Sequence, residues 1–173
     1  DFAPDVIFVC LPTPMDSDGT QDLSIVENVL NKIKELGIKS LIVVKSTVHP
    51  GNIKLIKDIF PKFIYNPEFL REKYANEDFI KSKLIVFGGD AESTSKLSEI
   101  YSQNFKCETQ DYVFTDLETA SLIKYSINTF LATKVIFFNE LKNLFNTINN
   151  ADSWENFTNA LSKDKRIGNS HMD

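Results

Sequence analysis

Continuous apolar runs alternate with stretches of helical period along the chain up to residue 114. The run DVIFVCLP at residues 5–12 is apolar without interruption after Asp5, which is typical of a parallel strand covered on both faces. Further strands are expected at 40–47, 62–65, 83–89 and 112–114. Helical periods separate them at 24–37, 52–60 and 91–104. Because strands and helices alternate with short loops, the pattern predicts right-handed crossovers and a parallel sheet.

The helix expected at 24–37 has signals at both of its ends. Ser24 and Glu27 have the spacing of a capping box, and Gly37 is a typical stop. The apolar stripe between these ends consists of Val26, Leu30 and Ile33.

The pattern changes at Thr115, after which no Gly or Pro occurs before residue 149. Thr115 and Glu118 have the spacing of a second capping box. Apolar residues then recur at helical spacing: Ile123, Ile127, Phe130, Leu131, Phe138, Leu141 and Phe145. We predict one helix over 115–148, roughly 50 Å long, of the kind that bridges domains or packs against a partner subunit. A shorter helix is expected at 153–164.

Length, composition and charge narrow the class of protein. The 173 residues are 42% hydrophobic and 25% charged, which is ordinary for one globular domain or slightly more. The net charge of -5 gives no electrostatic support for nucleic-acid binding. No apolar run approaches the roughly 20 residues that span a bilayer, and the first residues are no signal peptide, so no membrane partner is expected. Two cysteines make no disulfide framework or metal cluster, so we expect a cytoplasmic location.

Three polar loops follow the first three predicted strands. In a parallel sheet such loops gather at the carboxyl edge, where ligands bind. The loops are LPTPMDSDG at 11–19, KSTVHPG at 45–51 and NPEFLRE at 66–72. In the last of them Pro67 stops a strand and places Glu68 at its mouth.

Each candidate residue in these loops also has an ordinary structural explanation. The prolines and glycines fit turns, Ser46 and Thr47 fit helix N-caps, and Glu68 fits a solvated loop acid. Lys124 and Asn128 lie four residues apart on one helical face, where a single lysine is usually a surface charge. Convergence of these signals on one edge favours a functional site.

Five ordered motifs resemble those of the UDP-glucose/GDP-mannose dehydrogenase family. DVIFVCLPTPMDSDGTQDLS is similar to the family's strand and VPTP loop, and VVKSTVHPG to its STV-x-PG motif. NPEFLREKYANEDF resembles its NPEFLREG segment, and IKYSINTFLATKVIFFNEL its lysine-bearing helix. DKRIGN is similar to its RIG turn, and RIGNSHMD is similar to the UDP-glucose 6-dehydrogenase branch. The motifs cover nearly all of the chain.

The resemblance implies an α/β fold. Residues 1–113 would form the C-terminal half of a Rossmann-like NAD-binding domain. Residues 114–173 would form a central dimerisation helix and the start of an all-α middle domain. The partners implied are a UDP-sugar and a second copy of the chain, bound through the 115–148 helix.

The activity implied is oxidation of UDP-glucose to UDP-glucuronate by NAD in two hydride transfers, through a cysteine thioester. UDP-N-acetylmannosamine or GDP-mannose is the alternative substrate. Further alternatives are a non-catalytic dimerising fragment, a pseudoenzyme, or a phosphate-binding domain without catalysis.

The resemblance also assigns catalytic roles. Glu68 matches the family's acid/base for the water step, and Thr47 matches a threonine that orders water and approaches the nicotinamide. Lys124 matches the lysine that stabilises oxyanion character, and Asn128 matches its supporting amide.

Binding roles follow in the same way. Thr13, Thr47 and Glu72 match positions near the cofactor. Arg166 matches an arginine that reaches the neighbouring subunit's sugar-nucleotide site. The sugar nucleotide itself would lie along Phe69, Leu70 and Arg71.

The sequence departs from the family pattern in three places. Ser121 stands where the family often has Glu, and no GxGxxG occurs. Neither Cys10 nor Cys107 matches the family nucleophile, which follows the RIG segment. The expectation is therefore a piece of a longer enzyme, inactive by itself.

Overall fold

The computed structural model describes residues 4–109, 111–148 and 151–172. The chain forms two compact units, the first ending at Tyr125 and the second beginning at Ser126. Because this division falls within the long helix, the first unit contains the sheet together with the helix's first turns. Each unit is described separately.

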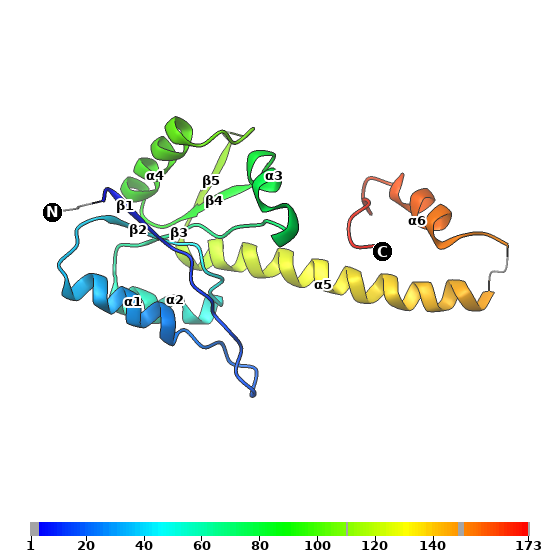
Figure 1. The fold of residues 1–173 in the computed structure, drawn as a ribbon, viewed down its shortest axis with the longest axis horizontal. Helices are drawn as coiled ribbons and strands as arrows, with labels where there is room; N and C mark the ends of the chain where they lie inside the picture. The colour runs from blue at the N-terminus through cyan, green and yellow to red at the C-terminus, as the bar shows by residue number, and fades with distance from the viewer. Residues whose placement is uncertain (1–3, 110, 149–150, 173) are drawn as a thin grey trace. The chain divides into compact units, whose positions relative to one another are not determined.

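The first unit is built on a five-stranded sheet in the order β1-β2-β3-β4-β5 (Figure 1). The strands are β1 (Val6–Val9), β2 (Leu41–Val44), β3 (Ile64–Tyr65), β4 (Ile85–Gly88) and β5 (Tyr112–Thr115). The helices are α1 (Ser24–Glu35), α2 (Ile53–Ile59), α3 (Ala75–Ile80) and α4 (Ala91–Asn104). Short 3-10 turns, η1 (Pro50–Asn52) and η2 (Glu72–Tyr74), precede α2 and α3.

The predicted parallel sheet is confirmed for every neighbouring pair except β3 and β4. These two strands are antiparallel, with Tyr65 opposite Gly88. The connection between them contains only η2 and α3, so the chain returns from the edge at which β3 ends without crossing the sheet. The whole segment between Asn66 and Leu84 consequently starts and ends at the edge where Glu68 was expected.

Both predicted capping boxes are wrong in detail. The N-cap residue of α1 is Leu23, and the Asp22 carboxylate accepts a hydrogen bond from the Ser24 N–H at 2.8 Å. The predicted stripe is buried, and Gly37, with φ 64°, ends the helix as predicted.

The long helix α5 spans Leu117–Ile148 and has 32 residues. Thr115 cannot cap it because Thr115 is the last residue of β5 and is paired with Gly88. Asp116 takes that place, and its carboxylate accepts the Thr119 N–H at 2.7 Å.

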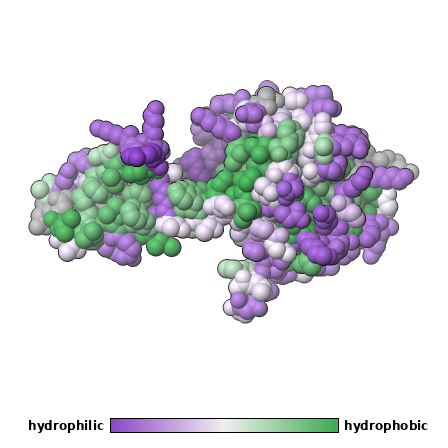
Figure 2. Space-filling model, turned by 180° about the vertical axis from the view of Figure 1, so that it is seen from behind, coloured by the Kyte–Doolittle hydropathy of each residue, from purple (hydrophilic) through white to green (hydrophobic). Residues whose placement is uncertain are grey.

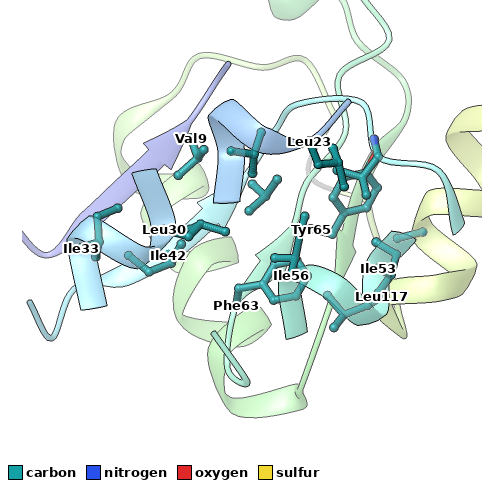
Figure 3. Close-up of a cluster of buried hydrophobic side chains, with 14 of the residues drawn as sticks. Val9, Leu23, Leu30, Ile33, Ile42, Ile53, Ile56, Phe63, Tyr65 and Leu117 are labelled. Carbon is teal, nitrogen blue, oxygen red and sulfur yellow. The ribbon is translucent and has the colours of Figure 1, made fainter. Parts of the chain in front are cut away.

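Apolar side chains fill both faces of the sheet. One core lies between the sheet, α1 and α2, and includes Leu30, Ile42 and Tyr65, all 0% exposed (Figure 3). The core on the other face contains Phe87 and, from α4, Leu97. Burying one such side chain stabilises the fold by about 1.5–3 kcal/mol relative to leaving it exposed.

Gly88 allows β4 to lie directly against the start of α5. A Cβ atom at this position would be 2.5 Å from the Cβ of Ala120 and 2.9 Å from the carbonyl oxygen of Asp116. Such distances are too short for non-bonded atoms, so the missing side chain fixes how closely the helix approaches the strand.

The second unit contains the rest of α5 and α6 (Trp154–Ser162). Ser153 caps α6 by accepting the Asn156 N–H at 3.1 Å. Rings of Phe145, Trp154 and Phe157 pack with centroids 5.0–5.6 Å apart. Other large apolar side chains of α5 are exposed, and hydrophobic surface gathers over this unit (Figure 2). No helix in the described part of the chain is long and apolar enough to cross a membrane.

Candidate active site

The loops after β1 and β2 meet at the carboxyl edge, as predicted. The Leu11 N–H donates to the Ser46 Oγ at 2.8 Å, and the Thr13 Oγ1 donates to the Thr47 carbonyl at 2.8 Å. The buried Ser46 hydroxyl and the Thr13 hydroxyl therefore connect the two loops to each other.

Glu68 and Lys124 meet at this edge. Asn66 and Pro67 end β3 and turn the chain, and the Glu68 carboxylate accepts the Leu70 N–H at 2.5 Å. The Lys124 Nζ, carried by α5, lies 3.3 Å from the Glu68 Oε1 and also donates to the Glu68 carbonyl oxygen. The Lys124 side chain is 6% exposed and the Glu68 side chain is 37% exposed. A buried ammonium thus lies beside a carboxylate that a ligand can reach.

Phe69 limits the solvent around this pair. The Lys124 Nζ lies 5.3 Å from the centre of the Phe69 ring, which is half-buried. A cation over an aromatic face is attracted to it and is partly removed from water.

A second lysine, Lys45, contacts the backbone just before Glu68 and was not predicted as a site residue. Its Nζ donates to the carbonyl oxygen of Asn66 at 3.2 Å and to the Asn66 Oδ1 at 3.0 Å. Burial lowers the pKa of Lys45. With Glu68 and Tyr101 it lines a small pocket of about 20 Å³. The available signal was its place, a charged residue directly after the four apolar residues of β2.

A larger cavity of about 570 Å³ opens beside Thr13 and Thr47. Gln21 connects the loops that line this cavity, and it too was not predicted as a site residue. The Gln21 Nε2 donates to the Thr47 carbonyl at 2.9 Å, and its Oε1 accepts the His49 N–H at 2.9 Å. Tyr125 completes one wall. Hydroxyl, amide and aromatic groups of this kind fit the polar and ring portions of a dinucleotide.

Ser121, the departure from the family pattern, has a structural role here. It is completely buried, and its hydroxyl donates to the Val48 carbonyl at 2.5 Å. The Tyr65 hydroxyl accepts the Val48 N–H at 3.2 Å. Both the N–H and the carbonyl group of Val48 are therefore hydrogen-bonded, which fixes the backbone after Thr47.

The Arg71 side chain pairs with Asp78, which lies seven residues further along the chain. Its Nε and Nη2 lie 2.9 and 2.7 Å from the two Asp78 carboxylate oxygens, and its N–H also donates to Asp78. The hydrogen bonds from Arg71 lower the pKa of Asp78 to about 2. The arginine thereby closes the loop that runs from Arg71 to Asp78, directly after Phe69 and Leu70. The side chain of Glu72 lies outside the described part of the structure.

Two predicted site residues belong to the second unit. Asn128 is exposed one turn after Lys124 on α5. Arg166 is exposed and pairs with Asp164 at 2.6 Å. It also lines an apolar cavity of about 590 Å³ with Phe137 and Phe157. The roles of Asn128 and Arg166 stay predictions.

Both cysteine thiols interact electrostatically with Lys45. Cys10 is exposed just after β1, and Cys107 is buried, which raises the pKa of its thiol. Among the described residues no cluster of three His, Cys, Asp or Glu side chains could hold a metal ion.

Comparison with known protein families gives two matches along the chain. The NAD-binding domain of the UDP-glucose/GDP-mannose dehydrogenase family matches residues 2–105. The central domain of the same family matches residues 118–173.

Individual relatives agree with these matches. A UDP-glucose 6-dehydrogenase of Rickettsia bellii is 40% identical over 97% of this chain. The structure of a UDP-glucose dehydrogenase from Pyrobaculum islandicum superposes with a TM-score of 0.84 at 33% identity, covering 97% of this chain. A GDP-mannose dehydrogenase from Pseudomonas aeruginosa gives 0.78 at 30% identity, covering 98%. The chain spans 40–42% of the length of these three relatives.

Proposed function

The chain belongs to the UDP-glucose/GDP-mannose dehydrogenase family, and on that premise we propose that the protein containing it oxidises UDP-glucose to UDP-glucuronate with NAD. Resemblance to UDP-glucose 6-dehydrogenases supports this substrate. The similarity to a GDP-mannose dehydrogenase makes GDP-mannose the second candidate.

The observation that carries the proposal is the contact between Lys124 and Glu68. A buried ammonium beside a reachable carboxylate provides a fixed positive charge and a proton acceptor within 3.3 Å of each other. The ammonium stabilises negative charge that develops on a substrate oxygen. The carboxylate takes the proton from the water that attacks the last intermediate.

The reaction removes four electrons from a primary alcohol. NAD, when bound, accepts these electrons as two hydrides in two successive rounds. A cysteine thiol of the whole protein adds to the aldehyde formed in the first round, and the second hydride transfer leaves a thioester. Water then hydrolyses the thioester and releases the carboxylate and the thiol. In this scheme Glu68 acts at the water step and Lys124 acts on the oxygen of the reacting carbon.

Thr13 and Thr47 would hold the cofactor. Both line the cavity of about 570 Å³ that Gln21 organises, within the same unit as Glu68. We propose that Glu72 contributes from the adjoining loop. Thr47 would lie between the cofactor and the water used by Glu68.

The sugar nucleotide would lie along the segment that leads into the Arg71–Asp78 pair. Phe69 and Leu70 provide half-buried apolar surface there. We propose that Asn128 supports Lys124. Arg166 would serve the site of a second copy, bound through the 115–148 helix.

The experiment is NADH formation by the full-length protein with UDP-glucose. We expect two NADH per sugar nucleotide. Glu68→Gln should lower kcat by about 10³-fold, because the water step loses its proton acceptor. Glu99→Gln, which changes an exposed glutamate of α4, is the matched control and should retain activity.

The other results separate the alternatives. NADH formation with GDP-mannose or UDP-N-acetylmannosamine alone would replace the substrate and keep the mechanism. No NADH with any sugar nucleotide would favour a pseudoenzyme or a non-catalytic fragment.

A further inference from the structure

Two lysines hold the turn that carries Glu68, one on each side of Pro67. Lys45 donates to the Asn66 carbonyl oxygen at 3.2 Å, and Lys124 donates to the Glu68 carbonyl oxygen. The two lysines come from different elements, the end of β2 and the third turn of α5. The backbone of the turn is therefore fixed by two separate ammonium groups.

The Lys45 side of the turn is fully bonded. The Asn66 Oδ1 accepts from Lys45 at 3.0 Å and also from the Tyr101 hydroxyl. The Asn66 Nδ2 donates to the Val86 carbonyl at 2.8 Å, and its N–H donates to the Val44 carbonyl at 2.9 Å. Asn66 is 1% exposed, so no ligand can replace these bonds.

On the Lys124 side of the turn, a substrate oxygen can compete with Glu68 for the ammonium group. Lys124 faces the Glu68 carboxylate, which is 37% exposed. If Lys124 stabilises an oxygen of the substrate, its bond to the Glu68 carbonyl is the one that must weaken. The turn then depends on its other lysine.

We propose that Lys45 is a positioning residue that keeps the Asn66–Glu68 turn in place while Lys124 turns from Glu68 to the substrate. This inference rests on the proposed function, because it assumes that Lys124 meets the substrate. Partial burial of a lysine has a cost for folding, and this burial lowers the pKa of Lys45. A role limited to packing could be filled by an apolar residue without that cost.

The test separates the water step from hydride transfer in single turnovers of the full-length protein. Stopped-flow absorbance follows the two NADH-forming phases, and quenched samples give the release of the uronate. Lys45→Met should slow uronate release at least about tenfold, because the carboxylate that takes the proton from water would no longer be held in place. The two NADH phases should change less than about threefold, so the variant should resemble Glu68→Gln.

Three further variants make the result decisive. Lys45→Arg keeps the charge and the donors and should restore uronate release to within about threefold of wild type. Lys45→Gln keeps N–H donors for Asn66, so it extends the test if Lys45→Met fails to fold. We expect Lys45→Gln to slow uronate release less than Lys45→Met does. Lys54→Met removes an exposed lysine of α2 and should change nothing.

The outcomes separate this inference from the proposed function. Slowing of all phases together, or no slowing, in both Lys45→Met and Lys45→Gln would overturn the positioning role while wild type still turns over. Absence of NADH from the wild-type protein with any sugar nucleotide would instead overturn the proposed function.

Discussion

The two units of the chain differ in how they treat their apolar side chains. In the first unit Ile56, Phe63 and Phe87 are at most 1% exposed. In the second unit Phe130, Ile136 and Phe137 are 59–67% exposed, although they lie on one continuous helix with the first unit's Leu117. The first unit therefore has a buried core on both faces of its sheet, whereas the second presents apolar helix surface of the kind that marks an interaction site.

The two units also differ in the burial of their polar side chains. Buried polar side chains such as Ser46, Asn66 and Ser121 all have hydrogen-bond partners in the first unit. In the second unit the arginine predicted to bind substrate is exposed and pairs with Asp164 in its own loop. A site made of buried, hydrogen-bonded side chains, as in the first unit, is already formed. A site made of exposed side chains, as in the second unit, needs another surface to complete it.

The largest expected effect comes from removing one isoleucine from each unit. Ile56→Ala should lower the free energy of unfolding by about 2–5 kcal/mol, because it leaves a cavity in the core. Ile136→Ala removes a side chain that is 64% exposed in a single copy, so it should cost no more than about 0.5 kcal/mol when the protein is dilute enough to be monomeric. Chemical denaturation of the full-length variants measures both changes. Equal losses would show that the second unit's surface is covered in the whole protein.

A charge on the exposed face of α5 should act on association. Phe137→Asp should weaken the proposed dimer by about 2–4 kcal/mol, or roughly 30- to 1000-fold in dissociation constant, because the interface would have to bury a carboxylate. Sedimentation velocity over a range of concentrations measures this change. Asn31→Asp, on the exposed side of α1, is the matched control. Unchanged association of Phe137→Asp would contradict the dimer proposal.

Removing one buried hydroxyl should distinguish the units again. Ser121→Ala leaves the Val48 carbonyl without its partner and should cost about 1–2 kcal/mol. Ser126→Ala, five residues further along α5 and exposed, should be neutral within about 0.5 kcal/mol. Urea midpoints of the two full-length variants give the comparison. A neutral Ser121→Ala would show that the loop after Thr47 is held by its other bonds.

The smallest effect is confined to alkaline solution. Burial raises the pKa of Tyr65 to about 12. A phenol whose folded pKa is raised contributes stability that is complete below pH about 10 and lost as the pH rises toward 12. The absorbance at 295 nm of wild type minus Tyr65→Phe should therefore rise with a midpoint near 12. A midpoint near 10 would show that water reaches the hydroxyl.

The sequence predicts the elements well where one signal dominates. Continuous apolar runs located the strands, and the absence of Gly and Pro located α5. The capping boxes failed because Asp22 and Asp116 offered better-placed carboxylates than Ser24 and Thr115. The antiparallel β3–β4 pair was missed because local periodicity carries no information about strand direction.

The candidate site was predicted only in part. Glu68, Thr13 and Thr47 follow from their places after strands, and the resemblance led to Lys124. Gln21 carries no local signal, and Lys45 has only its position after β2, because the roles of both arise from hydrogen bonds to residues 21 to 28 positions away. Such contacts depend on tertiary packing.

Gly88 limits which side chains this fold accepts at the end of β4. Its missing side chain lets α5 approach β4 so closely that even a methyl group would collide with Ala120. Lys124 is one helical turn beyond Ala120, so any displacement of the helix start also displaces its ammonium. A change from glycine to alanine would therefore displace the Lys124 ammonium from Glu68 without touching either residue. In an evolving population this position would therefore accept no side chain, and the cause would be a spacing of atoms alone.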